Sequence, residues 1–246
     1  MTKTDSVPSN KDSFASAIIL IAGSGSRMKG HVADKTLALL NDIPVFCYSI
    51  RAFLSSECVQ GFTIVYRDTQ QKAALEEALK LIALDGLPLT WVQGGDQRQD
   101  SVYKALISQP KHCSHVFIHD GARPLVTSDS IRSLNTAVLR DRSATLAHPV
   151  TDTIKRIPDA TDFTKVSLED LDRSRLWAIE TPQAFDLKLI LKAYEHVHET
   201  GLQITDETAA ISAIGLGTTL VPNDTTNIKI TRPEDLDYAA WKLGKR

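Results

Sequence analysis

The sequence predicts an α/β fold in which helices cover both faces of a mostly parallel sheet. In the first two-thirds of the chain, short runs rich in β-branched and apolar residues alternate with longer amphipathic segments. Polar loops that contain glycine follow three of the short runs. Because strands that alternate with helices are joined by right-handed crossovers, we expect a parallel, Rossmann-like sheet. Its ligands should bind at the carboxyl ends of the strands.

The segments that carry this pattern lie between residues 17 and 149. The predicted strands are Ala17–Ala22, Phe62–Tyr66, Leu89–Val92, Val116–His119 and Ala144–Pro149. The predicted helices are Pro44–Ser55, Thr69–Leu84, Arg98–Ser108 and Ser128–Arg140. In the second helix, Leu75, Leu79 and Ile82 recur at spacings of three and four residues, which is typical of an amphipathic helix.

A different pattern follows Val150 and predicts a β-hairpin arm inserted at about residues 151–172. The segments Thr153–Ile157 and Lys165–Leu168 alternate polar and apolar residues around a turn-like Pro158–Asp162. A two-stranded hairpin is only marginally stable by itself. We therefore expect the arm to project from the domain and to pack on a second subunit, which predicts a homodimer.

The remaining segments are expected to complete the same domain. Helices are predicted at Asp186–Glu199 and Asp206–Ile214, and strands at Thr218–Val221 and Asn227–Thr231. A last helix begins at Pro233, because proline in the first turn with acidic residues behind it favours a helix start. No internal repeat or linker divides the chain, so we predict one domain over residues 15–246 after a disordered polar tail at 1–14.

Composition limits the classes of function. The 246 residues are 42% hydrophobic, enough for a sizeable core, and a net charge of −2 provides no basic field for nucleic acid. The three cysteines, Cys47, Cys58 and Cys113, lack metal-site spacing and indicate reduced thiols, so we expect a cytoplasmic location. No apolar segment predicts a membrane span or a signal peptide.

The most informative segment is the loop after the first predicted strand, which reads Ala22-Gly23-Ser24-Gly25-Ser26-Arg27-Met28. Glycines let backbone N–H groups approach an anion closely, and Arg27 and Lys35 supply positive charge where a polyphosphate would lie. The spacing of glycine and lysine fits neither a P-loop nor a dinucleotide fingerprint. The loop predicts a different nucleotide-phosphate site, and a simple tight turn is the alternative.

The loop after the third strand is a second candidate for ligand binding. It contains Gly95, Asp96, Arg98 and Ser101, and it opens a helix whose N-terminus carries a positive dipole. Arg98 and Ser101 add hydrogen-bond donors. The alternative is that Asp96 only caps the helix while Arg98 is solvated, and the two roles are compatible.

The loop after the fourth strand contains Asp120 and Arg123. An aspartate at the end of a buried parallel strand, with an arginine three residues later, is a common arrangement for holding Mg²⁺ near phosphates. The alternative is a surface salt bridge, which contributes little to stability. We expect His119, which precedes this aspartate, to be structural rather than a catalytic base.

Four further motifs follow in the last third of the chain: Asp172-Arg173, Thr181-Pro182-Gln183, Thr205-Asp206-Glu207 and the segment Asn227–Leu236. The third is a plain helix start, with Thr205 or Asp206 as the cap. Lys229 lies between two isoleucines and should face away from the buried side of its strand. No Ser-His-Asp order, His-Glu-x-x-His motif or paired-carboxylate signal is present.

Together, and in this order, these motifs resemble the 2-C-methyl-D-erythritol 4-phosphate cytidylyltransferase family of the non-mevalonate isoprenoid pathway. The resemblance runs from about Ala17 to the C-terminal helix. It implies transfer of CMP from CTP to the substrate phosphate with release of pyrophosphate, and a requirement for Mg²⁺ bound mainly through the CTP phosphates. An ionised phosphate oxygen would attack the α-phosphorus of CTP, so no general base is needed and catalysis reduces to positioning and charge stabilisation.

The resemblance also assigns roles to individual residues. Arg27 and Lys35 would stabilise the transition state and the leaving pyrophosphate, while Arg173 and Lys229 would hold the substrate phosphate. The nucleotide would be bound by Ala22, Gly23, Ser24, Gly25, Gly95, Asp96, Arg98, Ser101 and Asp120. The substrate would be contacted by Asp120, Arg123, Thr153, Thr181 and Thr205. In this family the arm crosses to the partner subunit, so Thr153 and Arg173 would complete the neighbouring site.

Three residues depart from the family pattern. Ile21 stands where the family usually has alanine, and Asp34 and Thr36 flank Lys35 where proline and a glutamine-like residue are usual. Loss of the proline should loosen the loop, and the Asp34 carboxylate would be able to draw the Lys35 ammonium from phosphate. Two alternatives stay open: a ribitol-5-phosphate cytidylyltransferase, and a non-catalytic nucleotide-binding protein on the same fold. Retention of all four cations argues against the second.

Overall fold

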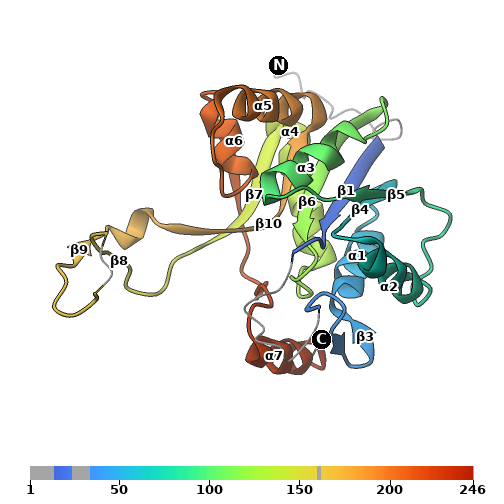
Figure 1. The fold of residues 1–246 in the computed structure, drawn as a ribbon, viewed down its shortest axis with the longest axis horizontal. Helices are drawn as coiled ribbons and strands as arrows, with labels where there is room; N and C mark the ends of the chain where they lie inside the picture. Colours follow the sequence, from blue (N-terminus) through green and yellow to red (C-terminus); the bar gives the residue numbers. More distant parts are fainter. Residues whose placement is uncertain (1–13, 24–33, 160–161, 246) are drawn as a thin grey trace, which may run out of the picture.

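The computed structural model describes residues 14–23, 34–159 and 162–245, and its centre is one seven-stranded sheet (Figure 1). The strand order is β11–β7–β10–β6–β1–β4–β5. The strands are β1 Phe14–Leu20, β4 Gly61–Tyr66, β5 Leu89–Gln93, β6 Cys113–Asp120, β7 Ser143–Pro149, β10 Trp177–Asp186 and β11 Thr219–Pro222. All neighbouring pairs are parallel except those of β10, which runs antiparallel to both β6 and β7. The predicted α/β class is confirmed.

Helices cover both faces of this sheet. They are α1 Val45–Ser56, α2 Thr69–Leu79, α3 Arg98–Ile107, α4 Ser128–Asp141, α5 Leu187–Thr200, α6 Glu207–Ala213 and α7 Pro233–Leu243. One apolar cluster joins α1, α2 and α4 to the sheet, and a second joins α3, α5 and α6 to the opposite face. Neighbouring residues of β1 enter different clusters, Ile19 the first and Ile18 the second, as expected for a strand buried on both faces.

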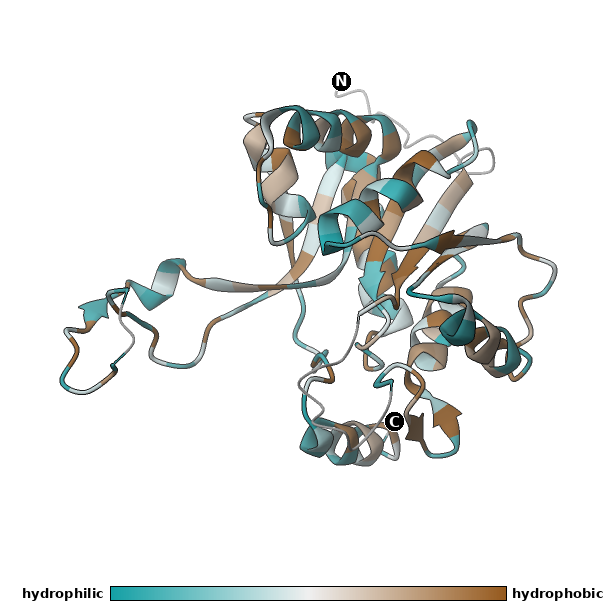
Figure 2. Cartoon of the chain, viewed as in Figure 1, coloured by the Kyte–Doolittle hydropathy of each residue, from teal (hydrophilic) through white to brown (hydrophobic). Residues whose placement is uncertain are grey.

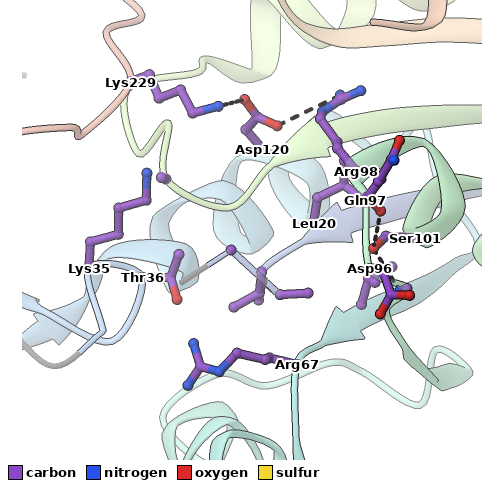
Figure 3. Close-up of a pocket in the computed structure, with 16 residues that line it drawn as sticks. Leu20, Lys35, Thr36, Arg67, Asp96, Gln97, Arg98, Ser101, Asp120 and Lys229 are labelled. Atoms are coloured by element: carbon purple, nitrogen blue, oxygen red, sulfur yellow. Dashed lines mark hydrogen bonds and ion pairs between the residues drawn. The ribbon is translucent and has the colours of Figure 1, made fainter. Parts of the chain in front are cut away.

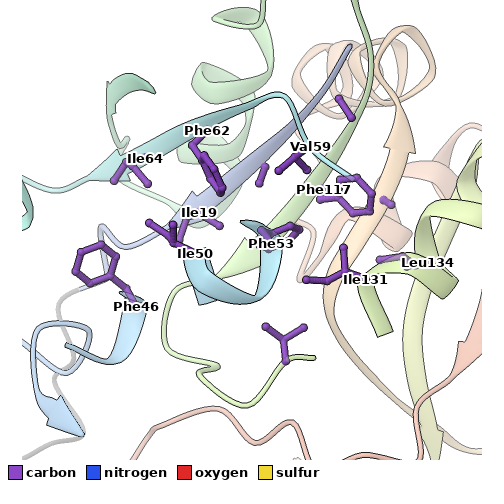
Figure 4. Packing of buried hydrophobic residues seen from close by; sticks show 14 of the residues in the cluster. Ile19, Phe46, Ile50, Phe53, Val59, Phe62, Ile64, Phe117, Ile131 and Leu134 are labelled. Carbon is purple, nitrogen blue, oxygen red and sulfur yellow. The ribbon is translucent and has the colours of Figure 1, made fainter. Parts of the chain in front are cut away.

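The first cluster is the larger one and is rich in aromatic rings. Phe53 of α1 lies between Phe62 of β4 and Phe117 of β6, in edge-to-face contacts with ring centroids 6.5 and 5.7 Å apart (Figure 4). All three side chains are buried. Such pairs contribute about 0.5–1.5 kcal/mol beyond the apolar area that they bury. This packing fixes α1 against β4 and β6.

A small third cluster holds α7 against the loops at the carboxyl ends of the strands. It includes Leu40, from a short hairpin of β2 Leu39–Leu40 and β3 Ile43–Pro44, together with Ala122, Ile230 and Ala239. Ile230 belongs to the predicted strand Asn227–Thr231, and that prediction is wrong. The segment pairs with no strand of the sheet and is instead held by hydrogen bonds to loops, among them Ile230 N to Ala122 O at 2.8 Å.

The arm projects away from the sheet, as Figure 1 shows at the left. A hydrogen bond from Val150 N to Leu176 O, 3.1 Å, closes its base. Its hairpin is shorter and later than predicted, because β8 Lys155–Arg156 pairs with β9 Glu169–Asp170 rather than with 165–168. Ion pairs across this ladder, Lys155 with Asp170 and Arg156 with Glu169, hold that register.

Apolar residues of the arm are exposed in the isolated chain. Ile154, Ile157, Phe163 and Leu168 are between 40% and 67% exposed. In Figure 2 the brown apolar residues lie mainly on the central strands and inner helix faces, and the arm carries further brown segments outside the core. Exposed apolar residues on a projecting element are typical of a contact surface.

Two further outcomes concern β10 and the N-terminus. The sequence pattern did not predict β10, which contains Pro182 and shifts register between Ile179 and Gln183 where that proline interrupts the ladder. The predicted tail lies almost entirely outside the described residues, and β1 begins at Phe14 instead of Ala17.

Across the described part of the chain, no helix combines the length and apolar character needed to span a membrane.

Candidate active site

A cavity of about 480 Å³ opens at the carboxyl ends of β1, β4, β5 and β6, where a parallel sheet is expected to bind its ligand (Figure 3). The residues that line it are Leu20, Ile21, Ala22, Gly23, Lys35, Thr36, Val65, Arg67, Gly95, Asp96, Gln97, Arg98, Ser101, Asp120, Ala122 and Lys229. Nine of the predicted site residues are therefore brought together here: Ala22, Gly23, Lys35, Gly95, Asp96, Arg98, Ser101, Asp120 and Lys229.

The other predicted residues lie elsewhere. Ser24, Gly25 and Arg27 are outside the described residues. Arg123 and Thr181 lie behind the cavity, where their side chains bond to other parts of the fold. The remaining three, Thr153, Arg173 and Thr205, are exposed and are not among the cavity residues.

The loop between β5 and α3 forms one wall and requires its glycines. A Cβ at Gly94 would lie 2.9 Å from both Ala22 Cβ and Ser101 Oγ, and one at Gly95 would lie 2.5 Å from Asp100 Cβ. The Gly95 amide donates to Ser101 Oγ at 2.9 Å. Side chains here would force the loop away from the end of β1, so the glycines bring backbone close to the ligand space.

The first turn of α3 differs from the expected cap. Gln97 is the N-cap residue, and the Asp100 carboxylate accepts a hydrogen bond from Gln97 N at 3.1 Å. Asp96 therefore does not cap the helix and lines the cavity instead. The N-terminus of α3 faces the cavity, which favours an anionic ligand there.

Arg98 is held by a partner that the sequence did not reveal. Its guanidinium forms a two-point ion pair with Glu207, with Nη1–Oε1 at 2.6 Å and Nη2–Oε2 at 3.0 Å. Glu207 is completely buried and also accepts from Tyr194 Oη at 3.1 Å. Asp206 does cap α6, accepting from Ala209 N, so the expected helix start is present. The neighbouring carboxylate, however, turns inward toward α3.

Asp120 ends β6 and is surrounded by cations. Its carboxylate lies 2.7 Å from Lys229 Nζ, 3.8 Å from Arg98 Nη2 and 3.9 Å from Arg123 Nε. Burial by itself would raise the pKa of Asp120, but Lys229, Arg98 and Arg123 outweigh it and lower the pKa to about 2. The carboxylate is thus ionised at neutral pH. It lies between Lys229 on one side and Arg98 on the other.

Thr181 and Arg123 support this arrangement from behind. Thr181 Oγ1 accepts a hydrogen bond from Asp120 N at 3.0 Å. Arg123 Nη1 donates to Asn227 O at 2.7 Å, and Asn227 Nδ2 donates to Thr181 O at 2.9 Å. In this way the segment before Lys229 is joined to the loop after β6 and to the middle of β10.

His119 is buried below the cavity and takes part in the same support. Its Nε2 lies 3.1 Å from Ser49 Oγ and its Nδ1 lies 3.2 Å from Thr181 Oγ1. Burial lowers the pKa of His119 to about 4, so the imidazole is neutral at pH 7. This agrees with a structural histidine.

Lys35 and Lys229 approach the cavity from segments far apart in the sequence. Lys35 Nζ donates to the carbonyl of Ile230, the residue after Lys229, at 3.0 Å. The carboxylate of Asp34, expected to draw Lys35 away, instead accepts from Thr36 N at 2.9 Å and Thr36 Oγ1 at 2.6 Å. In Figure 3 the Lys229 side chain extends to Asp120, and the Lys35 side chain points toward the segment that carries Lys229.

Several cavity residues were not among the predicted site residues, chiefly Arg67, Thr36 and Gln97. Arg67 follows β4, and its guanidinium lies 3.6 Å from Asp34. A basic residue directly after a predicted parallel strand is the signal that would have found it. Among the described residues, no group of three or more His, Cys, Asp or Glu side chains is arranged to hold a metal ion.

The glycine-lined strand ends, a helix N-terminus and two lysines at the carboxyl edge of a parallel sheet define an α/β protein with a site for an anionic ligand. The family model described as IspD, 2-C-methyl-D-erythritol 4-phosphate cytidylyltransferase, matches residues 15–245. The chain belongs to this family and is a cytidylyltransferase.

Individual relatives agree over nearly the whole chain. The 2-C-methyl-D-erythritol 4-phosphate cytidylyltransferase of Caldanaerobacter subterraneus subsp. tengcongensis is 38% identical over 230 residues, covering 94% of this chain and 99% of that protein. That of Desulforamulus reducens is 37% identical, covering 94% and 96%. The crystal structure of 4-diphosphocytidyl-2C-methyl-D-erythritol synthase from Anaerococcus prevotii matches with a TM-score of 0.80 and 25% identity, covering 95% and 97%. The family expected from the ordered motifs is confirmed.

Proposed function

We propose that this chain transfers CMP from CTP to 2-C-methyl-D-erythritol 4-phosphate, releasing pyrophosphate, in the synthesis of isoprenoid precursors. The observation that carries the proposal is the convergence of Lys35 and Lys229 at one cavity, with Lys35 Nζ on the Ile230 carbonyl at 3.0 Å. Two anionic reactants repel each other, so a site that joins them needs cations directed at both. Family membership over residues 15–245 supports the same reaction.

The nucleotide would lie between the end of β1 and the loop before α3. Ala22, Gly23 and Gly95 present backbone there, and Ser101 fixes the Gly95 amide. The triphosphate would then extend toward Lys35. Arg27 lies outside the described residues, and we keep it, with Ser24 and Gly25, as part of the proposed phosphate loop.

The chemistry would need no general base. The attacking phosphate oxygen is already ionised, and His119, which precedes Asp120, is buried and bonded within the fold. Attack on the α-phosphorus of CTP forms one P–O bond and breaks the bond to pyrophosphate. Lys35 and Arg27 would stabilise the charge that develops on the α- and β-phosphates.

Lys229 would receive the phosphate of the methylerythritol substrate. Its partner Asp120 keeps the ammonium at the cavity until the substrate arrives. We assign Arg98, Arg123 and Thr181 a positioning role instead of direct ligand contact, because their side chains bind Glu207, Asn227 and the Asp120 backbone respectively. Thr205, exposed beside α6, remains a proposed substrate contact.

Arg173 and Thr153 would act in the second subunit of a homodimer. Both lie on or beside the projecting arm and outside the cavity of their own chain, and Arg173 Nη1 donates to Thr151 O at 2.7 Å. The exposed apolar residues of the arm support a partner at this surface. Arms that cross would carry Arg173 to the partner's cavity, where it would meet the same substrate phosphate as Lys229.

Mg²⁺ would enter the site mainly with CTP. Asp120 and Asp96 are the carboxylates that line the cavity, and Asp120 is already surrounded by three cations. This donor set suits an ion that takes most of its ligands from substrate phosphates and water, with Asp120 as the protein ligand. When bound, the ion would neutralise phosphate charge.

A cytoplasmic location is proposed with this function, and the free thiols Cys47, Cys58 and Cys113 support it.

The test is pyrophosphate release by the purified protein. CTP would be supplied with methylerythritol phosphate or with ribitol 5-phosphate, each with Mg²⁺ and with EDTA. We expect release with methylerythritol phosphate and Mg²⁺, and at least about tenfold less with ribitol phosphate, which corresponds to about 1.4 kcal/mol of discrimination. Equal rates would favour the ribitol enzyme. CTP binding without release on either substrate would favour a nucleotide-binding protein.

A further inference from the structure

Gln71, in the first turn of α2, makes three hydrogen bonds that join separate parts of the cavity wall. Its Nε2 donates to the Ile21 carbonyl at 3.2 Å and to Asp34 Oδ2 at 2.5 Å. Its Oε1 accepts from Arg67 N at 2.6 Å. The side chain is 3% exposed, and each bond is therefore protected from water.

Asp34 is the centre of this arrangement. One carboxylate oxygen accepts from Thr36 N and Thr36 Oγ1, and the other accepts from Gln71 and lies 3.6 Å from the Arg67 guanidinium. Asp34 is only 8% exposed. A buried carboxylate is tolerated only when its oxygen atoms are paired, so these donors together hold Asp34 in its observed position.

The sequence positions of these residues give the contacts their significance. Ile21 follows β1 and precedes the glycine-rich segment, and Asp34 immediately precedes Lys35. The buried Gln71 amide thus joins Ile21, which comes just before the glycine-rich loop, to Asp34, which comes just before Lys35. Thr36, on the other side of Lys35, is held by the same carboxylate. The backbone of Lys35 is therefore held on both sides.

We propose that Gln71 and Asp34 are positioning residues that fix the direction of the Lys35 side chain toward the reacting phosphates. The inference rests on the proposed function for the role of Lys35, but the contacts themselves do not. Neither residue needs to touch a ligand: both act through the backbone of residues 34–36. Arg67 completes the group, because its backbone N–H holds Gln71 and its guanidinium faces both Asp34 and the cavity.

The kinetic test is a double-mutant cycle between Gln71→Ala and Lys35→Ala. We expect Gln71→Ala to lower kcat by about 10- to 100-fold while KM for CTP changes by less than about threefold, because misplacement of a catalytic group acts on the transition state. Lys35→Ala should cost about 100-fold in the normal chain but less than about tenfold in Gln71→Ala. The matched control is Gln93→Ala, since Gln93 Nε2 contacts the Arg67 carbonyl but neither Ile21 nor Asp34.

A second readout needs no turnover. The rate at which an acylating reagent modifies the Lys35 amine would be followed by peptide mass spectrometry, with the exposed Lys80 as internal reference. We expect several-fold faster modification of Lys35 in Gln71→Ala and no change in Gln93→Ala. If the normal chain proved inactive, the proposed function would fail while this measurement still tested the positioning role.

Thr36→Val provides a milder variant in case Gln71→Ala does not fold, since it removes only the hydroxyl bond to Asp34. It should change kcat and Lys35 modification in the same direction, by a smaller factor. Additive kinetic effects of Gln71→Ala and Lys35→Ala, together with unchanged Lys35 modification, would overturn the proposal. So would a fall in activity that matches the loss of folded protein in thermal melts.

Discussion

Lys229 Nζ lies 2.7 Å from the Asp120 carboxylate, although 109 residues separate them in the sequence. The pair places an ammonium at the cavity without leaving its charge uncompensated. A dianionic phosphate competes with a single carboxylate for that ammonium, because charge-assisted bonds strengthen with the charge of the acceptor. In the proposed function, Lys229 would pass from Asp120 to the substrate phosphate with a small movement of its side chain.

The first prediction concerns Lys229→Ala. It should raise KM for methylerythritol phosphate by at least about tenfold, while the dissociation constant for CTP changes by less than about threefold, since a charge-assisted bond to phosphate is worth about 1.5–3 kcal/mol. The two constants would be measured by steady-state kinetics and by calorimetry without the second substrate. Equal losses of affinity for both ligands would place Lys229 on the nucleotide instead.

A second prediction follows from the ionisation of Asp120. Its pKa in the folded protein, about 2, lies below the ordinary value of 3.8. The carboxylate therefore stabilises the fold fully above about pH 4, and this contribution is lost as the pH falls toward 2. Relative to Asp120→Asn, the free energy of unfolding of the normal chain should fall by about 1–2 kcal/mol between pH 5 and pH 2.5. Urea denaturation of both proteins at each pH measures this, and parallel curves would contradict it.

The third prediction separates transition-state stabilisation from binding. Lys35→Ala should lower kcat by about 100-fold and leave CTP affinity within about threefold, because one donor aimed at developing charge contributes about 3 kcal/mol. Arg27→Ala should behave alike. Single-turnover measurements with saturating CTP would report the chemical step. A normal rate in either variant would remove that residue from the transition state.

Arg98 and Glu207 provide the fourth prediction, which concerns stability. Arg98→Ala would leave the buried Glu207 carboxylate unpaired and should lower the free energy of unfolding by about 3–5 kcal/mol. The double variant Arg98→Met with Glu207→Leu should recover most of this loss, since an apolar pair of similar volume often replaces a buried ion pair. Chemical denaturation measures the difference.

The same double variant tests whether Arg98 also contacts CTP. If the role of Arg98 is structural, the affinity of the stable double variant for CTP should be within about threefold of normal. This is a difference of less than about 0.7 kcal/mol in binding free energy. A tenfold or greater loss in a protein of normal stability would restore the direct nucleotide contact that the sequence motif suggested.

The parallel part of the fold was predictable because each of its strands is an apolar run between polar loops. β10 was not, because its residues include Glu180 and Pro182, and its burial follows from its place between β6 and β7. Asn227–Thr231 showed the alternation of a strand, yet its backbone bonds to loops and its Asn227 side chain to β10. Local pattern predicts conformation there but not the pairing partner.

The candidate site shows a similar division. Glycines and cations at strand ends were visible in the sequence, since such loops meet at one edge of a parallel sheet. The partners of these residues were not visible in the sequence. Glu207 resembled an ordinary helix-start residue, and Asp34 was expected to draw Lys35 away from phosphate. Both are buried carboxylates with a partner far away in the sequence: Gln71 lies 37 residues from Asp34, and Arg98 lies 109 residues from Glu207. Only the tertiary structure shows which distant donors neutralise them.

The fifth prediction is that the active site is shared between two subunits. The arm leaves Ile154, Ile157 and Leu168 exposed in the isolated chain, and a second arm related by a two-fold axis would cover them. Lys35 and Arg173 would then belong to one site but to different chains. Sedimentation should show a dimer, and the aspartate pair variant Ile154→Asp with Ile157→Asp should shift it toward monomer with loss of activity.

Mixing two inactive proteins tests the sharing directly. Lys35→Ala and Arg173→Ala homodimers each lack one cation in both sites, whereas a heterodimer has one site that retains both cations and one that lacks both. After subunit exchange, confirmed by mass spectrometry of differently tagged chains, activity should return to about one quarter of normal, because half of the dimers are mixed and each has one complete site.

The matched control mixes Lys35→Ala with Lys229→Ala, because these two lysines line the cavity of one and the same chain. That heterodimer has no complete site, so at a substrate concentration well below the KM of the Lys229→Ala protein its activity should not rise above the mean of the two parent proteins. Recovery in the control, or none in the Arg173 mixture after proven exchange, would rule the arrangement out.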